Sequence, residues 1–191
     1  ITLIDSEGRP CSAISAVCGF NFTLYMIKPN GNTDKRELAY AHCNLKTQFP
    51  AILTIGEVNP VSLFGGYTEC SCIDSEGGII YIHSVNKIER VFLPSSEKAV
   101  NLAWCGQLVI SLAKSGRLFE SKCDDKLVFS EVSELKGIEI VSISGVFGHC
   151  LAVSKDGRVF VRGEAIKTNY GQLGLGRGTG KVAKFTEISS L

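Results

Sequence analysis

Short apolar runs separated by glycine-containing turns recur four times along this chain. The clearest copy has an apolar run at 149–153, a turn at Asp156-Gly157 and a second apolar run at 159–161. The runs are aliphatic and β-branched and too short for helices, so each copy predicts two antiparallel strands joined by a tight turn. The runs are almost continuously apolar, which indicates strands that are buried on both faces.

The other three copies align with this one at their turn glycines. Their two runs and the turn between them lie at 23–27, 30–31 and 38–40, at 69–73, 76–77 and 79–82, and at 108–112, 115–116 and 118–119. A repeat of about 40 residues built from paired strands is typical of a β-propeller. The sequence therefore predicts an all-β chain with one propeller region over residues 1–191. Its approximate repeats are 14–60, 61–98, 99–138 and 139–191.

Composition agrees with a core-rich β protein. The chain has 191 residues, of which 45% are hydrophobic, and no run of about 18 apolar residues that would predict a membrane span. It begins at Ile1 without a signal pattern, so we expect a piece of a longer cytoplasmic or nuclear protein. Of the eight cysteines, Cys70, Cys72, Cys105 and Cys150 lie in or beside apolar runs. We expect them to be reduced core residues.

The residues with catalytic potential do not form a recognisable constellation. The three histidines, His42, His83 and His149, fall on three different repeats without the spacing of zinc ligands. Neither a nucleophile elbow nor a zinc-protease motif occurs. The sequence therefore predicts a protein that is not an enzyme and that has no metal and no cofactor.

The fourth repeat carries a motif that identifies a family. Residues 148–153 and 155–160 are followed by Asn169-Tyr170-Gly171-Gln172-Leu173-Gly174. Together these segments resemble the repeat of the regulator of chromosome condensation family, in which paired strands continue into an Asn-x-x-Gly-Gln-Leu-Gly loop. The resemblance covers residues 143–185 and is weaker for the earlier copies. The resemblance implies that a set of residues forms a structural motif. These residues are Gly157, Asn169, Gly171, Gln172, Leu173 and Gly174.

Two positions depart from the family pattern. Val146 stands where the family has a glycine, with Gly145 one place earlier, and Arg162 stands where a tryptophan usually precedes Gly163. We expect the glycine-rich loop to allow close backbone approach between blades, with Leu173 filling their interface.

A second interpretation of the glycine-rich loop is a phosphate-binding loop at Gly180-Lys181. Leu175 occupies the place of its first glycine, and Val182 replaces the magnesium-binding hydroxyl residue. We therefore interpret the glycine-rich loop as a structural connection between blades and not as a phosphate-binding loop.

The resemblance implies a ring of seven blades. The four blades predicted here are little more than half of such a ring. We therefore expect the chain to need a complementary chain that completes the propeller, or to self-associate. We expect residues 184–188 to begin a further blade.

The family and the composition together suggest the function. We predict a non-catalytic protein-protein interaction module, and the alternative implied by the resemblance is a guanine-nucleotide exchange regulator of a Ran-like small GTPase. Candidate partner-binding residues are His149, Arg162 and Lys167, with a purely structural role as the alternative for His149. Residues 142–191 carry seven Lys and Arg against three Asp and Glu, but the pI of about 7.7 argues against nucleic acid.

Overall fold

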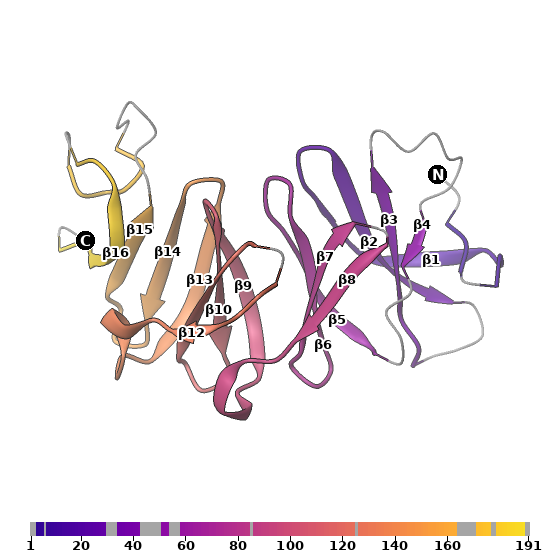
Figure 1. Cartoon of the computed structure of the whole chain (residues 1–191), viewed down its shortest axis with the longest axis horizontal. Coiled ribbons are helices and arrows are strands. Elements are labelled where there is room, and N and C mark those ends of the chain that lie inside the picture. The colour runs from indigo at the N-terminus through magenta and orange to yellow at the C-terminus, as the bar shows by residue number, and fades with distance from the viewer. Residues whose placement is uncertain are drawn as a thin grey trace. The chain divides into compact units, whose positions relative to one another are not determined.

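The computed structural model describes residues 3–5, 7–29, 34–42, 51–53, 58–84, 86–124, 126–163, 171–176 and 179–189. These residues form four antiparallel sheets of four strands each (Figure 1). The chain divides into two compact units, Ile1–Val91 and Phe92–Leu191, and each unit contains two of the sheets. The sheets are the propeller blades that the repeats predict.

Unit 1 holds the first two sheets, and each sheet follows chain order from one edge to the other. The first consists of β1 (Cys11–Cys18), β2 (Phe22–Pro29), β3 (Glu37–His42) and β4 (Ala51–Leu53). The second consists of β5 (Pro60–Gly65), β6 (Cys70–Asp74), β7 (Ile79–Ser84) and β8 (Lys87–Val91). An apolar core joins the two sheets, and its buried members include Phe22, Leu24, Met26, Leu38, Cys72 and Ile80.

Unit 2 repeats this plan and adds two short 3-10 helices. Its first sheet consists of β9 (Ala99–Cys105), β10 (Leu108–Ala113), β11 (Leu118–Lys122) and β12 (Ser130–Glu131), with η1 (Pro94–Ser96) before it and η2 (Ser133–Leu135) after it. The second consists of β13 (Ile140–Val146), β14 (His149–Ser154), β15 (Val159–Gly163) and β16 (Val182–Glu187). β9 packs against β13, and the shared core includes Ile110, Leu112, Ile143, Cys150 and Phe160.

The predicted strand pairs are confirmed, and their turns differ in one respect from a two-residue hairpin turn. Gly77, Gly116 and Gly157 have φ values of 86°, 85° and 90°, whereas the residue before each glycine has no positive φ. In the first of these turns the Gly77 N–H donates to the Asp74 carbonyl at 3.0 Å, and the Asp74 N–H donates to the Gly78 carbonyl at 2.9 Å. This pattern fits a three-residue loop in which only the last position needs the left-handed conformation. The turn at Gly31 lies outside the described residues.

A further turn of the same kind precedes the first sheet, although it is not one of the predicted repeats. The Gly8 N–H donates to the Asp5 carbonyl at 3.0 Å, and Gly8 has a φ of 77°. The Asp5 carboxylate accepts hydrogen bonds from the backbone of Glu7 and Arg9, as Asp74 does from the equivalent positions in its own turn. The signal was present in the sequence, because residues 4–8 and 73–77 are identical.

The segment expected to begin a further blade instead completes the fourth sheet. β16 pairs antiparallel with β15, with Thr186 opposite Val161 and Glu187 opposite Phe160. Phe185 is buried in the core of unit 2. The earlier interpretation was wrong because the loop between β15 and β16 is long, so the fourth strand is far in sequence from the hairpin that it joins.

Burial of the strands follows their place in each sheet. All five residues of β6 are buried, and so are all but the first residue of β10, in agreement with the continuous apolar runs. The edge strand β1 is different, since residues 12–16 are exposed. Cys70, Cys72, Cys105 and Cys150 are buried and free, as expected. Within the described part of the chain, no helix is long and apolar enough to cross a membrane.

Candidate interaction surface

The turns that join the first and second strands of the two sheets in unit 1 lie side by side and carry aromatic residues. The Phe20 N–H donates to the Tyr67 carbonyl at 2.8 Å. Their rings stack with a centroid distance of 4.8 Å, and yet Phe20 remains 72% exposed and Tyr67 41% exposed. Two large aromatic side chains are thus held in place by backbone and present much of their surface to solvent.

The equivalent turns of unit 2 are joined in the same way. The Gly106 N–H donates to the Phe147 carbonyl at 2.8 Å, so Phe147 occupies the position of Tyr67 and Gly106 that of Phe20. Phe147 is 53% exposed and has a φ of 64°, a conformation that costs free energy for a bulky residue. Strain of this kind persists where surrounding contacts hold it, often at a functional surface.

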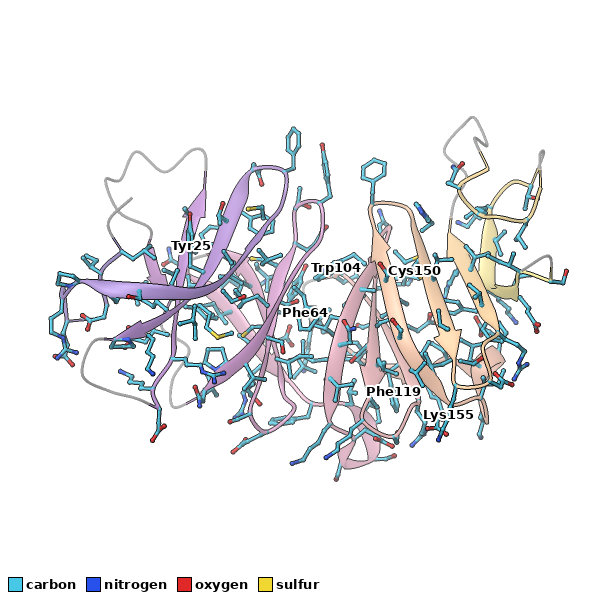
Figure 2. All side chains as sticks on the ribbon, turned by 180° about the vertical axis from the view of Figure 1, so that it is seen from behind. Tyr25, Phe64, Trp104, Phe119, Cys150 and Lys155 are labelled. Atoms are coloured by element: carbon cyan, nitrogen blue, oxygen red, sulfur yellow. The ribbon has the colours of Figure 1, made fainter. Side chains whose placement is uncertain are left out.

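A cleft of about 700 Å³ opens beside this turn of unit 2. It reaches from the ends of β9 and β13 to the ends of β11 and β15. Its wall includes Cys105, Gly106, Gln107, Leu108, Lys122, Asp124, Phe147, Gly148, Arg162, Gly163, Lys181, Val182 and Ala183. Figure 2 shows Trp104 and Cys150 toward this end of the strands of unit 2 and Lys155 toward the opposite end.

The structure places the predicted partner-binding residues in different settings. Arg162 borders the cleft, but its guanidinium forms an ion pair with Glu120 of β11 and lies 5.9 Å from the centroid of the Phe185 ring. Arg162 therefore joins the two sheets of unit 2. His149 is half-buried in β14 opposite Gly163 of β15. Lys167 lies outside the described residues.

The loop of the family motif closes an apolar cluster of unit 2. Leu173 is 1% exposed and packs with Val161 and Ile188. The Gly174 N–H donates to the Gly171 carbonyl at 2.9 Å, and both glycines have positive φ values. Gln172 is half-buried beside them, Gly157 forms the turn described above, and Asn169 lies outside the described residues.

The Cys105 thiol in the wall of the cleft and the Cys150 thiol in the core of unit 2 have unequal acidities. A side-chain hydrogen bond between Cys105 and Cys150 is the largest cause of both shifts, lowering the pKa of Cys105 and raising that of Cys150. The Arg162 guanidinium also favours the Cys105 thiolate, while burial further raises the pKa of Cys150. Burial raises the pKa of Cys70 in unit 1 to about 12.

The exposed aromatic turns of each unit and the cleft of unit 2 are the candidate interaction features. Among the described residues, no group of three or more His, Cys, Asp or Glu side chains is placed to hold a metal ion. Unit 1 exposes Phe20 and Tyr67 on its turns, and unit 2 exposes Phe147 next to a cleft with Lys122, Arg162 and Lys181 on its wall. Aromatic and arginine side chains are enriched where proteins bind one another.

The aromatic residues were missed at the level of sequence, although a signal was present. Each lies beside a glycine at the start of a repeat, as Gly19-Phe20, Gly66-Tyr67 and Phe147-Gly148. An aromatic residue there cannot be part of the strand core, because the chain reverses at the glycine. The predicted repeat is defined by the glycine of its second turn, whereas these aromatic residues lie in the first turn.

The chain has the fold of RCC1-type β-propeller blades, with sheets of four antiparallel strands that follow chain order and are repeated along the chain. The solved structures that it resembles include human WBSCR16, with 18% identity, a TM-score of 0.68, and coverage of 93% of this chain and 53% of that chain. Yeast RCC1 (Prp20) bound to Kap60 matches with 14% identity, a TM-score of 0.65, and coverage of 94% and 49%. Prp20p from Saccharomyces cerevisiae, described with its binding properties to Gsp1p and histones, matches with 17% identity, a TM-score of 0.63, and coverage of 95% and 52%.

The chain thus spans about half the length of these structures. No protein-family model matches the sequence, and no curated protein matches it. The chain is therefore similar to the solved structures in its fold.

Proposed function

We propose that this chain is a non-catalytic protein-protein interaction module and that the first turns of its repeats contact the partner. The observation that carries the proposal is the repeated arrangement of Phe20, Tyr67 and Phe147, which are exposed on turns linked by equivalent backbone hydrogen bonds. Aromatic side chains supply large contact areas at a low cost in conformational entropy. Phe20 and Tyr67 stack on each other, and contiguous exposed apolar area of this kind marks sites of protein interaction.

We expect Phe147→Ala to weaken partner binding by about 2 kcal/mol, the loss found when a central aromatic contact is truncated. The partner would first be identified in cells by a photo-crosslinking amino acid placed at position 147. Titration calorimetry with that partner then gives the affinity of the variant. Phe20→Ala tests the same role in unit 1.

Val141→Ala is the matched control, because Val141 is 53% exposed, as Phe147 is, and lies at the start of β13, whereas Phe147 follows the end of that strand. Crosslinks formed at position 141 as efficiently as at position 147, or equal affinities of the Phe147 and Val141 variants, would contradict the proposal. Melting temperatures of both variants show whether the fold is retained.

The alternative function is guanine-nucleotide exchange on a Ran-like small GTPase. It is supported by the likeness to Prp20p, described with its binding properties to Gsp1p and histones. Exchange needs a surface that stabilises the nucleotide-free GTPase and does not need a catalytic base. Release of labelled GDP from such a GTPase separates the two functions: acceleration that Phe147→Ala abolishes favours exchange, and release at the intrinsic rate favours the interaction module.

The proposal includes a second chain that pairs with unit 1. β1 is the edge strand of its sheet, and residues 12–16 on it are exposed, which makes it a template for another strand. We expect analytical ultracentrifugation to show self-association, or a complex once a complementary chain is added. Replacing Ile14, which is 48% exposed, with lysine should weaken that association. A species that stays monomeric under both conditions would argue against it.

A further inference from the structure

Two buried cysteines meet where the two sheets of unit 2 come together. Cys105 is the last residue of β9, and its thiol donates to the Arg162 carbonyl of β15 at 3.5 Å. Arg162 is the residue opposite Cys150 in the pairing of β14 with β15. Cys105 and Cys150 are far apart in sequence, but both belong to the same buried core cluster of unit 2.

A glycine permits this close approach. Gly145 of β13 pairs with Cys150, and a Cβ atom at position 145 would lie 2.5 Å from the Cys150 Cβ and 2.7 Å from the Trp104 carbonyl oxygen. The backbone of β9 therefore runs very close to the strand that carries Cys150. A disulfide requires two Cα atoms within about 7 Å, and this close approach of the strands brings the residue after Trp104 near Cys150.

The thiols of Cys105 and Cys150 differ in their exposure to solvent and in the residues around them. Cys105 is 6% exposed and lies in the wall of the cleft, close to Arg162, whereas Cys150 is 1% exposed and lies behind it in the core. A thiol on a cleft next to a guanidinium is the type that reacts, while a thiol enclosed by apolar residues is inert.

We propose that Cys105 and Cys150 form a reversible disulfide, with Cys105 reacting first with a hydroperoxide that enters the cleft. The Cys105 thiolate attacks an oxygen of the hydroperoxide, the O–O bond breaks, and the leaving alkoxide takes up a proton as an alcohol. Sulfur is oxidised to a sulfenic acid. The Cys150 sulfur then attacks the Cys105 sulfur, the S–O bond breaks, and the departing hydroxide leaves as water with the Cys150 proton.

In this sequence two thiols lose two electrons, and the hydroperoxide is reduced to an alcohol and water. The disulfide would tie β9 to β14 directly beneath the Gly106–Phe147 hydrogen bond. Oxidation would therefore restrain the turn that carries Phe147 and the floor of the cleft.

The test uses the purified chain and hydrogen peroxide as the probe. After oxidation, remaining thiols are blocked with iodoacetamide and the non-reduced peptides are mapped by mass spectrometry. We expect a peptide pair linked through Cys105 and Cys150 that dithiothreitol separates. In Cys150→Ser the linkage is lost and dimedone traps a sulfenic acid on Cys105, while Cys70→Ser, the matched buried control, leaves the linkage unchanged.

A second measurement needs no variant, so it holds even where a substitution impairs folding. In the reduced native protein, we expect iodoacetamide to modify Cys105 at least about tenfold faster than Cys70 at neutral pH, because the rate follows the thiolate fraction and access. The proposal is overturned if oxidised protein contains no Cys105–Cys150 peptide, if only the exposed Cys18 is oxidised, or if Cys105 is modified no faster than Cys70.

Discussion

Replacing Leu173 with alanine will lower the free energy of unfolding by about 2–5 kcal/mol, the range for truncating a buried leucine. Leu173 is 1% exposed and fills a space between Val161 and Ile188. Its removal leaves a cavity that the strands of a sheet cannot collapse to fill, because their spacing is set by hydrogen bonds. Urea denaturation followed by far-ultraviolet circular dichroism measures the loss.

Leu175→Ala is the control for this effect. Leu175 belongs to the same loop but is only partly buried against the cluster, so the same chemical change should cost clearly less. Equal losses for the two variants would mean that the loop as a whole, and not the Leu173 side chain, stabilises unit 2. No loss for Leu173→Ala would show that the family motif has no structural role in this chain.

A methyl group at Gly145 is expected to destabilise unit 2 by about 1–3 kcal/mol or more, the cost of overpacking. The added Cβ would meet the Cys150 Cβ at 2.5 Å and the Trp104 carbonyl oxygen at 2.7 Å. The second of these is backbone, so relief requires β9 to move away from β13. At about 2–4 °C per kcal/mol for a chain of this size, a thermal melt detects the change readily.

Gly180→Ala is the matched control, since no atom lies within 4 Å of a Cβ built at Gly180. Its melting temperature should equal that of the unchanged protein. If Gly145→Ala melts at the same temperature as Gly180→Ala, then β9 and β13 are not as closely packed as the structure has them. A displaced β9 would also lower the yield of the Cys105–Cys150 disulfide, which links this prediction to the redox proposal.

The central two strands of each sheet were predictable because the physics that forms them is local. The runs at 149–153 and 159–161 became β14 and β15 with little change, and the same holds for β6 and β7. A hairpin forms where two short apolar runs flank a glycine turn, so it depends only on residues that are close together in the sequence. The first and fourth strands, such as β1 and β16, have weaker patterns because one or both of their faces meet solvent.

The candidate site was predicted less well. Arg162 borders the cleft but is held by Glu120, which no sequence pattern relates to it. Phe20, Tyr67 and Phe147 were missed because the repeat is defined by the glycine of the second turn in each copy, whereas these residues lie in the first turn. Cys105 and Cys150 were correctly expected in the core as reduced thiols. Their contact was not foreseen, because each belongs to a different repeat.

By itself, the sequence determined the hairpin repeat, the all-β class and the likeness to one propeller family, since these depend on side-chain periodicity and turn chemistry over a few residues. Only the tertiary structure decided which turns meet, where the cleft opens and which thiols touch. Those contacts join residues from different sheets, and the packing of one sheet on the next depends on the shape of both surfaces at once.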